Sequence, residues 1–179
     1  KEALLIKGIN VVPVKNLGDI LKFLNDGVQR PVENENILET EPVDDDIDFS
    51  DIKGQFLAKR AVEIAAAGGH NIFLIGDPGS GKSMLAKRMT TILPEMYEEE
   101  IIDTTKIYSI AGMLSEEEPI ITKRPFRAPH HTASIVSLVG GSVKPGEISL
   151  ALHGILFLDE LGEYPTKLLE VLRQPLEDG

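Results

Sequence analysis

The residues with the clearest chemical potential form the octapeptide Gly76-Asp77-Pro78-Gly79-Ser80-Gly81-Lys82-Ser83. It follows the pattern Gly-x-x-x-x-Gly-Lys-Ser/Thr, which is typical of loops that bind nucleotide phosphates. Glycines in such a loop let successive backbone N–H groups face inward on a polyphosphate. We therefore expect this loop and the following Met84 to bind ATP. Lys82 would reach the outer phosphates as a catalytic residue, and Ser83 would offer its hydroxyl to Mg²⁺.

A phosphate loop needs a strand before it and a helix after it, and the neighbouring residues predict both. The apolar run Ile72–Ile75 is typical of a buried parallel strand. Beyond the loop, apolar residues recur at helical spacing at Leu85, Met89, Ile92 and Leu93. A chance glycine-rich turn is the alternative, and the order of strand, loop and helix argues against it.

A second chemical landmark is the carboxylate pair Asp159 and Glu160, which follows the apolar run Ile155–Leu158. In an open α/β sheet, ligands bind at the carboxyl ends of the strands. The pair is therefore expected beside the phosphate loop, with Asp159 holding Mg²⁺ and Glu160 polarising an attacking water as a catalytic residue. Together the two landmarks predict an α/β fold of the P-loop NTPase type, a mostly parallel sheet with flanking helices.

Composition shifts divide the chain into three parts, residues 1–30, 31–50 and 51–179. The first part predicts a helix over Leu17–Asn25, is too small to hold a core, and reads as the tail of a preceding domain. The second is acidic and typical of a flexible linker, since Glu33 to Asp51 contains nine acidic residues and no Lys or Arg. The third part carries both landmarks and reads as the ATPase domain.

Four further elements are expected in the third part. Residues 98–113 predict a helix, and a tight exposed loop is expected over 137–146 because of its glycines and proline. Residues 147–152 read as a strand that returns from this loop. A last helix is expected to start at Pro165 and to break at Pro175.

The composition limits the kinds of binding partner that are expected. The 179 residues carry a net charge of −11, which argues against non-specific coating of nucleic acid. Without the acidic stretch the remainder carries about −2 (−11 plus nine), so a local basic patch on DNA stays open. No apolar run approaches the ~20 residues of a membrane span, so no membrane partner is expected. The chain has no cysteine, which fits a reducing cytoplasm.

The segment Arg124–Ser134 holds two prolines, which forbid a helix interior and allow an edge strand. Its adjacent histidines, His130 and His131, have two interpretations. Neighbouring side chains on a regular strand point to opposite faces, which makes joint chelation of a metal awkward. We favour a polar strand end near Glu160 that senses the nucleotide.

The chain resembles AAA+ ATPases, and more narrowly the magnesium-chelatase-like group with its ComM-type competence proteins. Beyond the phosphate loop, the segments that carry the resemblance are Lys53–Gln55, Ala65–Asn71, Arg124–Ser134, Pro145–Ala151, Gly154–Glu160 and Leu172–Glu177. The resemblance covers about residues 51–179. More weakly, residues 1–30 resemble the end of a Lon-like N-terminal domain.

The resemblance implies a homo-oligomeric, hexameric ring that hydrolyses ATP with Mg²⁺. ComM-type members remodel DNA by branch migration, which is the function we expect. A chelatase subunit that drives Mg²⁺ into a porphyrin is the alternative, and a scaffold that binds ATP without hydrolysis is a third reading. The resemblance also implies a hairpin centred on Gly141–Gly146 that reaches the ring pore, with Lys144 as a candidate pore residue.

Family members continue with a fourth strand that carries a sensor, a fifth strand, an arginine finger and a helical lid. None of these matches a segment of the 179 residues, so we expect a C-terminally truncated domain. The missing fourth strand would lie between strands 71–75 and 155–159 and leave them without their shared neighbour. We also expect negligible ATP hydrolysis by these residues alone, since an arginine finger contributes about 10³- to 10⁵-fold in related phosphoryl transfer.

Overall fold

The computed structural model describes residues 9–26, 47–115 and 118–178. Most of the predicted acidic linker lies outside these ranges. In chain order, the elements are α1 (Leu17–Asp26), η2 (Phe49–Asp51), α2 (Phe56–Gly68), α3 (Lys82–Met89), η3 (Thr90–Ile92), α4 (Glu98–Ala111), β1 (Phe126–Arg127), α5 (Ile135–Val139), α6 (Glu147–Leu150), β2 (Ile155–Leu156), η4 (Leu161–Glu163) and α7 (Thr166–Asp178).

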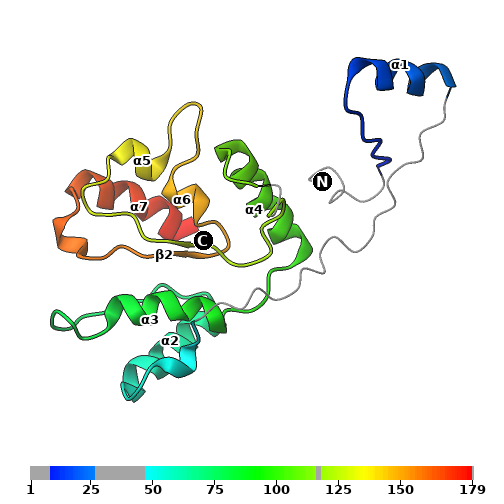
Figure 1. Ribbon diagram of the computed structural model, residues 1–179. Coiled ribbons are helices and arrows are strands. Elements are labelled where there is room, and N and C mark those ends of the chain that lie inside the picture. Colours follow the sequence, from blue (N-terminus) through cyan, green and yellow to red (C-terminus); the bar gives the residue numbers. More distant parts are fainter. Residues whose placement is uncertain (1–8, 27–46, 116–117, 179) are drawn as a thin grey trace.

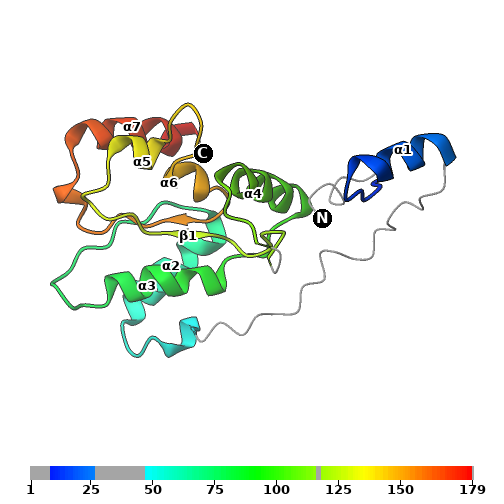
Figure 2. The ribbon, with the colours of Figure 1, turned by 45° about the horizontal axis from the view of Figure 1, so that its top comes forward.

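The helix predicted in the first part of the chain is present as α1. It buries none of its residues. Figures 1 and 2 both show α1 apart from the other elements. The described core therefore begins with η2. There the Asp48 side chain accepts a hydrogen bond from the Ser50 amide, and the Asp51 carboxylate accepts one from the Asp48 amide, a reciprocal cap.

Two short parallel strands lie at the centre of the remaining elements. Phe126 pairs with Ile155 and Arg127 with Leu156. Helices α5, α6 and α7 cover one side of the pair, and α2 and α3 lie on the other side (Figures 1 and 2). The edge strand allowed by the prolines of Arg124–Ser134 is thus confirmed as β1, and the described sheet is parallel.

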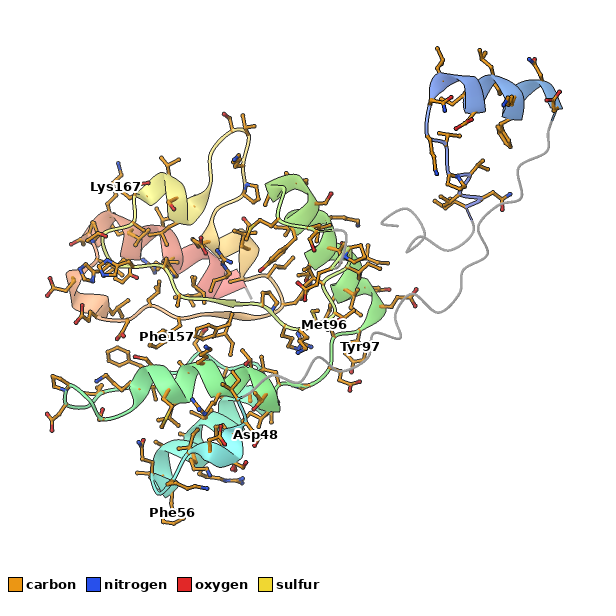
Figure 3. All side chains as sticks on the ribbon, viewed as in Figure 1. Asp48, Phe56, Met96, Tyr97, Phe157 and Lys167 are labelled. Carbon is orange, nitrogen blue, oxygen red and sulfur yellow. The ribbon has the colours of Figure 1, made fainter. Side chains whose placement is uncertain are left out.

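Residues of the β2 region alternate between the two sides, as a strand requires. Ile155 packs against the cluster formed by η2, α2 and α3, which includes the predicted helix positions Leu85 and Met89. Leu156 and Leu158 instead pack against the cluster of α5 and α7. Figure 3 shows Phe157 on the side that faces α3. This alternation fixes the direction in which the chain leaves β2 toward Asp159.

Close approach of the two strands depends on a glycine just before β2. A Cβ atom added to Gly154 would lie 2.1 Å from the Pro125 carbonyl oxygen. The same carbonyl accepts a hydrogen bond from the Ile155 amide at 2.8 Å. A side chain at position 154 would therefore separate β1 from β2.

The strand predicted over Ile72–Ile75 is wrong for the described residues. This segment has no assigned strand, and the side chains of Phe73 and Ile75 are 69% and 85% exposed. Leu74 alone of the three packs against the core of α2 and α3. The physical reason is that a strand needs a hydrogen-bonded neighbour. The described sheet consists of β1 and β2, and neither pairs with Ile72–Ile75. The longer strand predicted over residues 155–159 is likewise reduced to Ile155–Leu156.

Three other predictions need correction. Residues 147–150 form α6 rather than a returning strand, and Glu147 lies in its first turn, where a negative charge favours helix. The tight exposed loop expected over 137–146 is wrong at its start, because residues 137–139 belong to α5 and Leu138 is buried there. The loop that follows α5 closes through one antiparallel bridge between Gly140 and Pro145. Helix α7 continues through Pro175 to Asp178, so the predicted break is absent.

The remaining helix predictions are confirmed. The helix predicted over residues 98–113 is present as α4, which is capped by Gly112 in a left-handed conformation. Helix α7 begins directly after Pro165 and buries Leu168 and Leu172. Among the described residues, none of the helices has the length and apolar character that crossing a bilayer requires.

Candidate nucleotide-binding site

The glycine-rich loop closes around the Lys82 ammonium group. Lys82 Nζ donates to the carbonyl oxygens of Gly76 at 2.9 Å and Asp77 at 3.0 Å. Gly79 and Gly81 have φ values of 77° and 85°, a backbone region that disfavours side chains. The loop therefore has the backbone that the motif requires, and Lys82 sits at its base in the first position of α3.

The second landmark meets the first across 76 residues of sequence. The Ser83 hydroxyl donates to Asp159 Oδ2 at 3.0 Å. Ser83 lies in the first turn of α3, and Asp159 follows β2 by three residues. The parallel strand pair thus delivers the carboxylate to the N-terminal end of the helix that follows the loop, as expected for the carboxyl end of a strand in an α/β fold.

A left-handed backbone turns Glu160 away from the strand direction. Glu160 has φ 51° and ψ 52°, and its amide donates to Asp159 Oδ1 at 3.0 Å. Its carboxylate oxygen Oε2 lies 3.2 Å from His131 Nδ1. The two neighbouring carboxylates therefore have different partners: Asp159 faces the loop helix, and Glu160 faces the histidine pair.

The histidine pair follows β1, and its two rings are in contact at a tilt of 38°. The centroids of His130 and His131 are 4.1 Å apart, and His131 meets the Tyr164 ring edge-on at 6.5 Å. The Tyr164 hydroxyl donates to the Pro129 carbonyl at 2.7 Å. Burial, and secondly the negative charge of Asp159, raise the pKa of Tyr164 above its ordinary value. Tyr164 therefore stays a neutral hydrogen-bond donor that holds this segment in place.

Oxygen donors suited to Mg²⁺ are present at the meeting of loop and carboxylate. A serine hydroxyl beside a carboxylate oxygen matches the hard-oxygen ligands that Mg²⁺ prefers, with its remaining positions filled by water and substrate phosphates. Ser83 and Asp159 are the residues that would hold the ion. Within the described ranges, no group of three His, Asp or Glu side chains gathers into a further metal site, and this includes the His130–His131 segment.

The other predicted loop residues have less distinct positions. Pro78 is exposed within the loop, and Met84 is 37% exposed in the first turn of α3. Ser80 donates its amide to the Asp77 carbonyl at 3.2 Å, which forms a turn inside the loop. Lys144, the candidate pore residue, is exposed in the turn that precedes α6.

Sequence reasoning missed three polar side chains that make long-range contacts, and one of them, Gln55, contacts the loop. Gln55 Nε2 donates to the Ser80 carbonyl at 2.9 Å. Arg127 forms a bidentate ion pair with Glu147, in which Nε and Nη2 donate to the two carboxylate oxygens at 2.6 and 2.8 Å. The available signal was their place in the segments Lys53–Gln55, Arg124–Ser134 and Pro145–Ala151, which marked them as family features without assigning a contact.

A glycine-rich loop before a helix, with its serine bonded to a carboxylate at the end of a parallel strand, is the arrangement of a P-loop nucleotide-binding core, the class to which AAA+ proteins belong. The comparisons with known proteins agree. The chain belongs to the family of the magnesium chelatase subunit ChlI, which matches residues 48–179. The resemblance inferred from the sequence is therefore confirmed.

Relatives extend the match to the whole chain. The chain is 46% identical to the competence protein ComM of Haemophilus influenzae over 99% of this chain and 36% of that protein. It is 44% identical to the uncharacterized protein Rv2897c of Mycobacterium tuberculosis over the same shares. It is 49% identical to YifB of Escherichia coli over 74% of this chain and 26% of that protein. The matches thus span little more than a third of ComM and of Rv2897c, and about a quarter of YifB.

Proposed function

We propose that this chain carries the nucleotide site of an ATP-hydrolysing motor that assembles as a homo-oligomeric ring and remodels DNA. The observation that carries the proposal is the 3.0 Å bond between Ser83 and Asp159 next to the lysine of the loop. It brings an ammonium group, a hydroxyl and a carboxylate from distant segments to one place. That combination suits a nucleoside triphosphate with its metal ion.

Each residue has a defined task in this proposal. Backbone amides of Gly76–Ser83 and the N-terminus of α3 bind phosphate oxygens. Lys82 exchanges its two loop carbonyls for the outer phosphates and stabilises negative charge there. Mg²⁺, held by Ser83 and Asp159, supplies further neutralisation of phosphate charge.

Glu160 orients the attacking water in this scheme, and His131 controls whether it is free to do so. With its carboxylate 3.2 Å from His131 Nδ1, Glu160 is directed toward β1 and not toward the loop. Hydrolysis then requires Glu160 to leave His131, which makes the histidine segment a sensor of the nucleotide. This assigns the His130–His131 pair to control and not to metal binding.

The ComM-type reading, and with it DNA as the proposed partner, is preferred here over a chelatase subunit because of the extent of the two matches. The match to the competence protein ComM covers 99% of the chain, whereas the match to the chelatase family begins at residue 48. Lys144, in the exposed turn between α5 and α6, is the residue proposed to face the ring pore and the nucleic acid. A cytoplasmic location belongs to the same proposal. A chelatase motor subunit is the second candidate, favoured by the family match alone.

The nucleotide site is tested by thermal unfolding of the full chain with and without Mg²⁺-ATP. At 100 times the dissociation constant, ATP should stabilise the wild type by about 2.7 kcal/mol. Lys82→Ala should abolish this stabilisation. Lys87→Ala changes an exposed lysine of the same helix and serves as the control, which should keep it. An unchanged response of the Lys82→Ala variant would discredit the assignment of the loop.

The partner is tested by the ATPase activity of a full-length protein that contains these residues, because negligible hydrolysis is expected of the 179 residues alone. Branched DNA should stimulate the wild type and fail to stimulate Lys144→Ala to the same extent, while both keep equal basal activity. Stimulation by a porphyrin-chelatase partner with no effect of DNA would decide for the second candidate.

A further inference from the structure

Gln55 has an unfavourable backbone and a side chain that serves a distant segment. Its φ and ψ are 49° and 40°, in the left-handed region, directly after Gly54 at φ 66°. A residue with a Cβ atom adopts this conformation at an energetic cost. The two left-handed residues turn the chain into α2, and they aim the Gln55 amide at Ser80, 25 residues further on.

The side chain lies directly against the peptide that joins Ser80 to Gly81. Gln55 Nε2 is 2.9 Å from the Ser80 carbonyl oxygen. A Cβ atom added to Gly81 would come within 3.0 Å of the same nitrogen. The Gln55 amide therefore fixes this peptide by a hydrogen bond and by contact.

Holding the carbonyl also sets the direction of the neighbouring N–H group. The C=O and N–H of a trans peptide point to opposite sides of the chain. With the Ser80 carbonyl turned to Gln55, the Gly81 N–H must face away from it. Within the part of the chain that the structure describes, this N–H meets no backbone acceptor. It is therefore free to bind a phosphate oxygen.

A role in the stability of α2 does not account for the side chain. Gln55 precedes α2, but its side chain makes no capping hydrogen bond to that helix. The first helical bond uses the Gln55 carbonyl instead, which accepts from the Lys59 amide at 2.9 Å. Phe56, the next residue, is 86% exposed and points away from the other elements in Figure 3. The left-handed turn thus buries nothing of its own and yields the contact with the loop.

We infer that Gln55 is a positioning residue for phosphate binding, which orients the Gly81 amide of the loop through the Ser80 carbonyl. The inference rests on the proposed function of the loop as a triphosphate site. It assigns Gln55 to the phosphates and not to the base, so its effect is the same for any ligand that carries a triphosphate.

Two variants of the full chain separate this role from a structural one. Gln55→Gly removes the amide and relieves the left-handed backbone. Gln55→Asn keeps an amide and tolerates the left-handed region, but its side chain is one methylene too short to reach Ser80. Affinity is measured by displacement of a fluorescent ATP analogue with Mg²⁺-ATP, Mg²⁺-GTP and Mg²⁺-tripolyphosphate. Thermal unfolding of the ligand-free chain is measured alongside.

We expect both variants to bind all three ligands about tenfold more weakly, the effect of one lost hydrogen bond. The melting temperature of ligand-free Gln55→Gly should not fall. Unchanged affinities would overturn the inference. A loss confined to the nucleotides, with tripolyphosphate unaffected, would overturn it too, because Gln55 would then act on the base. Lys82→Ala is run in parallel: if it binds tripolyphosphate as the wild type does, the proposed site itself fails, whatever Gln55 does.

Discussion

Arg124 joins three segments, and its replacement has a large and calculable cost. The nitrogens Nη1 and Nη2 donate to the two carboxylate oxygens of Glu100 at 3.2 and 2.9 Å. Nη1 also donates to the His153 carbonyl at 2.7 Å, and Nη2 to the Glu95 carbonyl at 3.1 Å. Nε donates to the Pro94 carbonyl. One guanidinium group thus ties the start of α4, the turn before it and the turn before β2.

The expected cost of Arg124→Lys follows from burial and geometry. The side chains of Arg124 and Glu100 are only 14% and 22% exposed, so solvent screens the pair weakly. Removing one partner of a buried pair costs about 3–5 kcal/mol. Lysine keeps the charge but loses the planar fork that reaches several acceptors at once. We therefore expect the free energy of unfolding to fall by about 2–4 kcal/mol, below the full cost of deleting the charge.

Urea unfolding of the full chain measures this loss. Arg60→Lys is the matched control, because Arg60 pairs with Glu63 at side-chain exposures of 72% and 45%, and an exposed pair of this kind contributes at most about 0.5 kcal/mol. A loss below about 0.5 kcal/mol for Arg124→Lys would refute the reasoning. So would a weakened affinity for ATP at unchanged stability, since it would place Arg124 at the nucleotide.

Three further predictions concern the site and the same ion pair. In the full-length protein that contains these residues, Glu160→Gln should bind Mg²⁺-ATP like the wild type but stop turnover, and ATPase activity near the wild-type rate would show that Glu160 does not orient the water. His131→Ala frees the Glu160 carboxylate, so basal ATPase activity should rise while its stimulation by DNA shrinks; a fall in basal activity would contradict the restraint we assign to His131. Burial alone would raise the pKa of Glu100, but hydrogen bonds from Arg124 and from the Tyr97 amide outweigh it, and the pKa is lowered from 4.5. The stability that this pair contributes is therefore complete above pH 4.5 and is lost as the pH falls through the lower folded-state pKa of Glu100. The free energies of unfolding of the wild type and of Glu100→Gln, measured in urea, should converge in that pH range. A difference that stays constant with pH would count against this role of the pair.

The meeting of the two landmarks was predictable because it depends on a general rule of α/β folds. Ser83 follows a loop with a recognisable pattern, and Asp159 follows an apolar strand. The carboxyl ends of parallel strands and the helix after a phosphate loop converge at one edge. Their 3.0 Å contact across 76 residues needed no knowledge of the intervening chain.

The strand before the loop could not be judged from its residues alone. Ile72–Ile75 has the apolar composition of a buried strand, yet hydrogen bonds to a neighbour decide whether a strand forms. The one described neighbour of β2 is β1, and Phe73 and Ile75 remain largely exposed. Composition describes what a segment would bury and says nothing of what is there to cover it.

The Gln55 contact and the Arg127 pair were beyond sequence reasoning for another reason. The Gln55 amide reaches Ser80 only because two consecutive residues are left-handed, and Gln is not a residue that predicts this conformation. Arg127 and Glu147 are 20 residues apart, and Glu147 was assigned to a strand that is in fact the first turn of α6. Because Glu147 was predicted to lie in a strand, its contact with Arg127 could not be anticipated.

The two arginines of the segment Arg124–Ser134 take no part in the proposed phosphate binding, because of their charge partners and their position. Arg127 lies in β1, and its guanidinium pairs with Glu147 at side-chain exposures of 24% and 21%. Arg124 is bound in the same way by Glu100. Carboxylates neutralise both charges, so neither arginine adds positive potential at the loop. Among these described residues, Lys82 is the one whose positive charge lies at the loop. The arginines hold β1 in position, and a correctly held β1 is what brings His131 within 3.2 Å of Glu160.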